Sequence, residues 1–141
     1  MKRSMIMIAA VAACTLATAA PAVADNDKPI TVDCNAGTTI GAVLAKKAEK
    51  DGPIVLRVLG TCQENITINR DDVTLDGDVG ATIVGGIIIA SSQRVVVANL
   101  TITSSDINGV LVTNGSAATI RDNIIKDSQF YGIFVQHGSF A

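Results

Sequence analysis

The sequence of 141 residues is poor in aromatic and charged side chains and contains no tryptophan. Aromatic residues make up 3% and charged residues 17%, while 48% of the chain is hydrophobic, a composition that excludes intrinsic disorder. Eleven lysines and arginines face 13 aspartates and glutamates, so the chain has no basic surplus for binding nucleic acid. The three cysteines form no Cys-x-x-Cys pair, and the chain has a single histidine, so the ligand spacing of a zinc site is missing. The length suits a single domain.

The N-terminal segment 1–24 has the pattern of a secretory signal peptide. Lys2 and Arg3 form a short positive region, an apolar run covers residues 5–20, and residues 22–24 (Ala-Val-Ala) match a signal-peptidase site. We therefore expect cleavage there and export to the periplasm or outside the cell, with no membrane association afterwards. An uncleaved membrane anchor and a lipoprotein attached through Cys14 are the alternatives. Cleavage leaves nine basic and thirteen acidic residues, a formal charge of −4.

Two cysteines, Cys34 and Cys62, remain after the predicted cleavage. An exported protein normally folds in an oxidising compartment, so these residues are expected to form a disulfide. The bond would close a loop of about 30 residues and stabilise the fold by about 3 kcal/mol in the loop-entropy model. Two buried free thiols are the alternative.

Residues 25–63 are predicted to form an N-terminal cap with one helix and one strand. Apolar residues recur at helical spacing over residues 38–50, and lysines gather near the end, where they complement the helix dipole. Thr38 or Thr39 can cap the start of this helix, and a Gly-Pro pair ends it. The β-branched run that follows predicts a strand over residues 54–59.

From residue 64 onward the sequence repeats at a regular interval. A glycine followed by three apolar residues occurs at Gly86, Gly109 and Gly132, and residues 64–86 form a looser copy. Other positions keep the same spacing: Val97 with Ile120, Ile102 with Ile125, and Gln93 with Ser116 and Ser139. A fixed period of about 23 residues is typical of a stacked-coil solenoid.

Each repeat contains three short β-branched runs, as at residues 87–89, 95–97 and 100–102. Gly, Asn, Asp and Ser separate these runs and favour turns. Three strands per coil leave no room for a helix and predict a parallel β-helix, in which equivalent strands pair about 4.8 Å apart. Leucine-rich repeats have a similar period, but their leucine consensus is missing here.

The segments around the two cysteines and the glycine repeats resemble the start of exported β-helix proteins of the pectin lyase-like superfamily. These segments are residues 32–37 (VDCNAG), residues 59–68 (LGTCQENITI) and the repeats at Gly109 and Gly132. The resemblance covers about residues 30–141. It implies an all-β, right-handed parallel β-helix solenoid of about three and a half coils of 22–23 residues, with an N-terminal capping α-helix. The superfamily includes lyases, hydrolases, esterases, epimerases and non-enzymatic adhesins, so the motifs are specific for the fold and not for a reaction.

In that superfamily the substrate usually lies on the outer face of the strand after the repeat glycine. If Ile87 and Ile89 point inward, two columns of side chains point outward. These columns are Thr67, Ile88, Leu111 and Phe134, followed by Asn69, Ala90, Thr113 and Gln136. Neither column contains a carboxylate, a lysine or an arginine. We therefore predict no catalytic residue, no cofactor and no metal site within this sequence.

Three weaker candidates have structural alternatives. Four aspartates at positions 71, 72, 76 and 78 offer oxygen ligands for Ca²⁺, but beside glycines they are more typical of a solvated turn. His137 follows the outward Gln136, where it can serve as a base or have a structural role. Asn123 takes an inward position and is expected to bond backbone groups.

All four aromatic residues lie among the last twelve positions, and Phe134 stands at the end of a column that becomes more apolar with each coil. Aromatic rings stack on the apolar faces of sugars. Phe134, together with Thr113, Gln136 and His137, is therefore a candidate ligand-binding set for a polysaccharide. The alternative is that a loop or a later coil covers Phe134.

The sequence stops partway through a repeat, without a polar capping segment. A solenoid whose last coil is uncovered exposes its core and its strand edges, so we expect further coils beyond Ala141 or self-association at this coil. Three classes of function stay open. They are the N-terminal part of a carbohydrate-active enzyme, a carbohydrate-binding or adhesive surface protein, and a structural fragment without activity. The superfamily resemblance favours a saccharide-related role.

Overall fold

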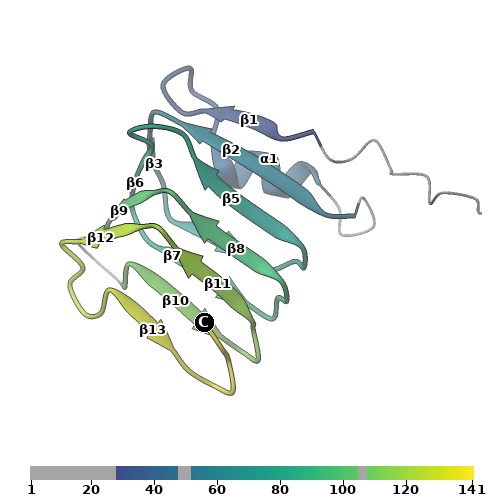
Figure 1. Cartoon of the computed structure of the whole chain (residues 1–141), viewed down its shortest axis with the longest axis vertical. Helices are drawn as coiled ribbons and strands as arrows, with labels where there is room; N and C mark the ends of the chain where they lie inside the picture. Colours follow the sequence, from purple (N-terminus) through teal and green to yellow (C-terminus); the bar gives the residue numbers. More distant parts are fainter. Residues whose placement is uncertain (1–27, 48–51, 105–107) are drawn as a thin grey trace, which may run out of the picture.

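The computed structural model describes residues 28–47, 52–104 and 108–141, which form three parallel β-sheets and one α-helix (Figure 1). The predicted signal peptide and Cys14 lie outside the described residues. The elements are β1 (Ile30–Asp33), α1 (Ile40–Lys46), β2 (Ile54–Leu59), β3 (Thr61–Gln63), β4 (Ile66–Ile68), β5 (Val73–Gly77), β6 (Thr82–Val84), β7 (Ile87–Ala90), β8 (Val95–Ala98), β9 (Thr101–Thr103), β10 (Val110–Thr113), β11 (Ala118–Arg121), β12 (Ile124–Lys126) and β13 (Ile133–Val135). Among the described residues, no helix has the length and apolar character needed to cross a membrane.

Three successive strands make one coil, and equivalent strands of successive coils pair in parallel. The sheets have the orders β1-β2-β5-β8-β11, β3-β6-β9-β12 and β4-β7-β10-β13. The described residues thus contain four coils, which begin at β2, β5, β8 and β11 (Figure 1). The predicted parallel β-helix solenoid is confirmed. Its first coil starts at Ile54, ten residues before the position at which the sequence predicted the repeats to begin.

The offset between paired residues varies because the turns differ in length. Val110 pairs with both Ile87 and Ile133, at the interval that the sequence period predicts. Ile66 pairs with Ile87, an interval two positions shorter. One glycine separates β2 from β3, whereas four residues separate β5 from β6. Six residues separate β9 from β10 and β12 from β13, but only two separate β3 from β4 and β6 from β7.

The core runs through the coils and consists of the inward side chains of all three sheets. In the sheet that ends with β13, Ile68, Ile89 and Val112 pair in one row and are each 0% exposed. Burying a side chain of this size stabilises the fold by about 1.5–3 kcal/mol relative to leaving it in water. The alternation of buried and partly exposed residues along β7 shows which of its side chains face outward.

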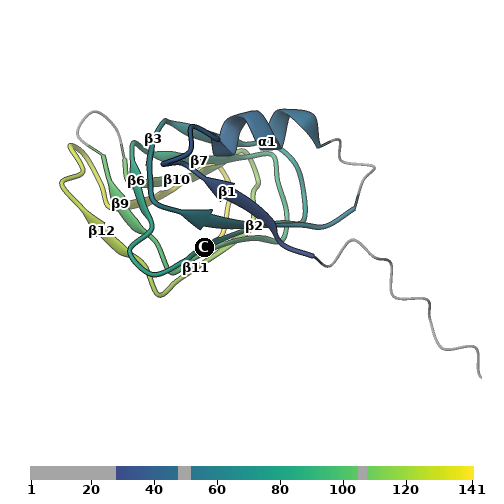
Figure 2. The same cartoon turned by 90° about the horizontal axis from the view of Figure 1, so that it is seen from above.

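Helix α1 covers the N-terminal end of the coils, over the sheet that begins with β4 (Figure 2). Thr39 is its N-cap and accepts a hydrogen bond from the backbone N–H of Ala42 at 3.2 Å. The Glu64 carboxylate accepts from the N–H groups of Ile40 at 2.6 Å and Gly41 at 2.9 Å. The first coil therefore satisfies backbone donors that the first turn of a helix leaves without partners.

The helix ends earlier than the sequence predicted. Its last helical residue is Lys46, whereas the prediction extended to position 50, and residues 48–51 lie outside the described part. The buried guanidinium of Arg70 donates to the carbonyl of Lys47 at 3.0 Å and to that of Gly52 at 2.5 Å. Arg70 follows β4, so these bonds hold the end of α1 and the segment just before β2 against the end of the first coil.

A disulfide joins Cys34, in the turn after β1, to Cys62 in β3. The two Cα atoms are 5.0 Å apart and the residues are 28 positions apart in sequence. Cys62 is 2% exposed and belongs to the core. The bond therefore links the N-terminal cap covalently to the first coil.

Candidate functional site

The outer face of the sheet β4-β7-β10-β13 carries the two predicted columns of side chains. Thr67 pairs with Ile88, Ile88 with Leu111, and Leu111 with Phe134. Their neighbours along these strands are buried in the first three coils, so this column points away from the core. Thr113 pairs with Ala90 in the second column. The two columns are thus rows of uncharged side chains on paired parallel strands.

Two aromatic rings stack at the end of the first column. The ring centroids of Tyr131 and Phe134 are 4.9 Å apart, with an angle of 20° between the ring planes. Tyr131 is 56% exposed and Phe134 is half-buried. The backbone of Tyr131 is held by the previous coil, because its N–H donates to Asn108 Oδ1 at 3.2 Å and its carbonyl accepts from Gly109 at 2.9 Å.

Tyr131 was missing from the candidate set predicted from the sequence. It lies in the turn before β13, where spacing along the strand does not apply, so its position depends on the turn conformation. The signal available was a pair of aromatic residues three positions apart around Gly132. The structure adds Tyr131 to the candidate site because it covers part of the Phe134 ring.

The second column ends in a polar group formed by Thr113, Gln136 and His137. Thr113 Oγ1 lies 3.0 Å from His137 Nδ1 and accepts from Gln136 Nε2 at 3.4 Å. Thr113 is 7% exposed, so its hydroxyl holds the other two side chains and offers little surface of its own. Gln136 is two residues after Phe134, a distance of about 7 Å along an extended strand. The structure therefore brings all four predicted ligand-binding residues into one region.

Hydrogen bonds between serines of successive coils join the turns that follow the strands of this sheet. The N–H of Ser92 donates to Ser116 Oγ at 3.1 Å, and the N–H of Ser116 donates to Ser139 Oγ at 3.1 Å. Ser92 and Ser116 are 0% exposed. The sequence period matches Gln93 with Ser116, and the paired strands on both sides of the turn keep that interval. The hydrogen bond nevertheless joins Ser92, one residue earlier, to Ser116. Different backbone turns cause this shift, since positive φ angles occur at Ser91 and Arg94 in one coil and at Asn114 and Gly115 in the next.

Asn123 points inward and bonds the backbone, as predicted. Its side-chain oxygen accepts from the N–H of Leu100 at 2.9 Å, and its Nδ2 donates to the carbonyl of Val97 at 2.8 Å. Both bonds join neighbouring coils at the corner between two sheets. The residue therefore satisfies buried backbone groups and has a structural role.

The four aspartates near the β5 strand each have a protein partner. Asp72 forms an ion pair with Arg94, with Oδ1 and Nε 2.5 Å apart, and Asp71 accepts from the N–H of Gln93 at 2.8 Å. Asp76 accepts from Asn99 Nδ2 at 2.7 Å. Asp78 accepts from the N–H of Val79 at 2.8 Å and lies 3.3 Å from an arginine nitrogen of β2. These contacts favour the turn interpretation of the cluster.

The ion pair at Asp72 also changes its titration. The hydrogen bond from Arg94 lowers the pKa of Asp72 below its ordinary value of 3.8. At Asp78, the hydrogen bond from the Val79 N–H, followed by the bond from Arg57, lowers the pKa in the same way. Both carboxylates are thus stabilised in the charged form by groups of the folded chain.

Asp72→Asn is expected to lower stability at neutral pH and to have no effect in strong acid. Because the folded pKa is depressed, the carboxylate contributes stability above 3.8, and this contribution is lost as pH falls through the lower folded value. Asparagine tolerates the φ of +58° at this position, so the substitution changes charge without adding backbone strain. Urea unfolding of both proteins at neutral pH and well below pH 3.8 measures the difference.

Arg94→Gln and the double variant complete a thermodynamic cycle for this pair. If the ion pair carries the effect, the two single changes are non-additive at neutral pH and become additive in acid. Added salt is expected to reduce the coupling, because the Arg94 side chain is 64% exposed. Additive effects at neutral pH contradict the prediction.

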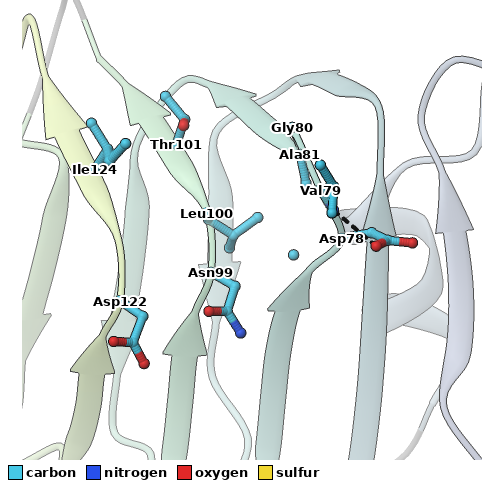
Figure 3. A pocket seen from close by; sticks show the side chains of 10 residues that line it. Asp78, Val79, Gly80, Ala81, Asn99, Leu100, Thr101, Asp122 and Ile124 are labelled. Atoms are coloured by element: carbon cyan, nitrogen blue, oxygen red, sulfur yellow. Dashed lines mark hydrogen bonds between the residues drawn. The ribbon is translucent and has the colours of Figure 1, made fainter.

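A separate hollow of about 410 Å³ lies at the corner between β5, β8 and β11 and the next sheet (Figure 3). Leu100 and Ile124 give it an apolar wall, and Asp78 and Asp122 stand at its edge. The four-residue turn between β5 and β6 forms the opposite side. Asp122 lies 2.8 Å from an Arg121 nitrogen, so both acidic groups are paired. None of the predicted ligand-binding residues lines this hollow.

One group of metal-ligating residue types comes together among the described residues: Cys34, Cys62 and Glu64 have ligand atoms within 4.8 Å of one another. The two sulfurs are bonded to each other and are therefore not thiolate ligands. Both oxygens of Glu64 accept hydrogen bonds from the start of α1. The arrangement is accounted for by the disulfide and the helix cap.

Comparison with family models identifies the repeats. The model described as "right handed beta helix region" matches residues 56–141, more than half of the chain, from β2 to the last coil. Comparisons with curated proteins and with solved structures found no match.

Proposed function

The chain belongs to the right-handed β-helix family, and from this premise we propose that it is an exported protein that binds a polysaccharide on the outer face of the β4-β7-β10-β13 sheet. Proteins of this family stack their strands into long regular faces. Such a face suits an extended polymer, because equivalent side chains recur at every coil. The superfamily resemblance of the cap and repeats supports a saccharide as the ligand.

The stacked pair Tyr131–Phe134 beside Gln136 and His137 is the observation that carries this proposal. A sugar ring has an apolar face of C–H groups and a rim of hydroxyls. Aromatic rings bind the first by stacking, and amide, phenol and imidazole groups hydrogen-bond the second. A well-placed polar group beside an apolar contact fixes the orientation of the ligand.

Binding explains this face better than catalysis does. The two outward columns of the described strands contain no carboxylate, whereas general acid–base chemistry on a glycosidic bond requires a pair of them. The enzyme alternative assigns catalysis to coils beyond Ala141. In that case this face holds the polymer while another part of a longer protein cleaves or modifies it.

Phe134→Ala and Tyr131→Ala are each expected to weaken polysaccharide binding by about tenfold or more. Removing either ring eliminates the stacked pair that contacts the sugar face. Affinity electrophoresis through gels containing a panel of polysaccharides identifies the ligand, and titration calorimetry gives the change in Kd.

Phe130→Ala is the matched control for these variants. Phe130 is 66% exposed and next to Tyr131 in sequence, but it is not part of the stacked pair. It should bind like the unmodified protein. Equal weakening of polysaccharide binding by all three changes would contradict a specific role of the Tyr131–Phe134 pair. Urea unfolding checks that each variant is folded.

The export part of the proposal is supported by the signal-peptide pattern and by the Cys34–Cys62 disulfide. Expression of the full chain in a bacterial host tests it directly. Mass spectrometry of the protein recovered outside the cytoplasm should show cleavage after Ala24. Recovery of uncleaved chain from the cytoplasm alone would contradict export.

A further inference from the structure

The proposed binding face carries no charge in either of its outward columns. Along the described strands and at the residue that follows β4 and β13, the outward positions hold only hydroxyl, amide, aliphatic and aromatic groups. They are Thr67, Ile88, Leu111, Phe134, Asn69, Ala90, Thr113 and Gln136. Tyr131 and His137 complete the site at its end.

The arginines of the described chain are held by other protein groups. Arg57, Arg94 and Arg121 pair with aspartates, and the nitrogens of buried Arg70 donate to backbone carbonyls. Arginine is the side chain best suited to bidentate recognition of a carboxylate. A polymer of uronic acids presents one carboxylate per sugar, and neither outward column offers such a carboxylate a cationic partner when it loses water. The described cation beside these columns is Lys47, which lines a hollow with Thr67 and Asn69 at the first coil, far along the sheet from the Tyr131–Phe134 pair of the last coil.

The charge of the whole protein acts in the same direction. The chain has a net charge of −2, and removal of residues 1–24 would make it −4. A negative protein repels a polyanion over a distance of several ångströms, set by the ionic strength. Local desolvation and long-range repulsion therefore both disfavour an anionic polymer.

We infer that the ligand of this face is an uncharged polysaccharide and not a polyuronate, an inference that rests on the proposed polysaccharide-binding function. The Tyr131–Phe134 pair stacks on the apolar face of a neutral sugar. Gln136 and His137 hydrogen-bond its hydroxyls. Binding that depends on these contacts changes little with salt, because no counterions are released from the polymer.

Two pairs of polymers test the inference, since each pair shares a backbone and differs in charge. The first is hydroxyethyl cellulose and carboxymethyl cellulose; the second is methyl-esterified polygalacturonan and polygalacturonate. The full chain should be retained in affinity electrophoresis by the neutral member of at least one pair. Its charged counterpart should bind at least about tenfold more weakly.

A variant with a cation added to the face should bind charged polymers more strongly than the unmodified protein does. Ala90→Lys puts a cation in the second outward column, beside Thr113. It should strengthen retention by the charged polymers about threefold to tenfold and make that retention sensitive to salt. Thr82→Lys adds the same charge to an outward position of the β3-β6-β9-β12 sheet and should have no such effect.

The outcomes separate this inference from the function on which it rests. Stronger, salt-sensitive retention of the unmodified protein by a charged polymer, with loss in Tyr131→Ala, overturns the neutral-ligand inference and leaves polysaccharide binding in place. Equal gains in Ala90→Lys and Thr82→Lys also overturn it, because the face would then not be where the polymer lies. Absence of retention by all four polymers and throughout the wider polysaccharide panel overturns the proposed function itself.

Discussion

Ile89→Ala is expected to lower the free energy of unfolding by about 2–5 kcal/mol, because it opens a cavity in the middle of the stacked core. Ile89 is 0% exposed and lies between Ile68 and Val112, which are also fully buried. Neighbouring strands are paired on both sides, so the backbone has little freedom to collapse into the space. Urea unfolding followed by circular dichroism measures the change in midpoint and slope.

Ile88→Ala is the matched control, since it removes the same atoms from the adjacent residue of β7. Ile88 points outward and is only half-buried. Its replacement should therefore cost clearly less than that of Ile89, and it should leave less of a cavity. A larger loss at Ile88 than at Ile89 would mean that the inward and outward assignment of this strand is wrong.

Removal of the disulfide by Cys34→Ala and Cys62→Ala together is expected to destabilise the protein by about 3–4 kcal/mol in the loop-entropy model. The bond spans 28 positions and constrains the unfolded chain over that length. Its loss should also free the cap, because Cys34 lies between β1 and α1. Chemical denaturation measures the stability, and hydrogen exchange at α1 reports the local effect.

Reduction of the unmodified protein provides an independent version of this experiment. Dithiothreitol should lower its stability to near that of the double variant, while leaving the double variant unchanged. If reduction has no effect although both thiols become reactive, the disulfide contributes nothing to stability and the prediction fails. Alanine is preferred to serine here because Cys62 is buried, and a serine hydroxyl would need a partner.

The architecture was predictable because its signal repeats along the chain. Regularly spaced apolar triplets predict that Ile87, Val110 and Ile133 lie side by side, and the structure pairs them. The pairing of Ile66 with Ile87 was harder to predict, since the interval is two positions shorter there. Turn length changes the period without changing the strands, so a fixed spacing describes only the coils with equal turns.

The candidate site was predictable where the repeat determines a position and less so where turn conformation does. The outward position of Phe134 follows from alternation along a strand, and the backbone bonds of Asn123, at a corner, follow from the repeat. The stacking of Tyr131 and the serine at position 92 depend on turn conformation, including left-handed residues that are not glycine. Several side chains can adopt that conformation at similar cost, so composition alone does not identify the turn.

The variable corners give the molecule a form of modularity. Along the sheet of β2, β5, β8 and β11 the sequence interval from one coil to the next lengthens, yet the paired strands stay in phase. Insertions at a corner such as that between β5 and β6 alter the outline of one coil and leave the outward columns aligned. A change in the length of such a corner can therefore remodel it while the side chains of the outward columns keep their positions. Corner shape and outer-face side chains can thus vary at separate sites of the same coil.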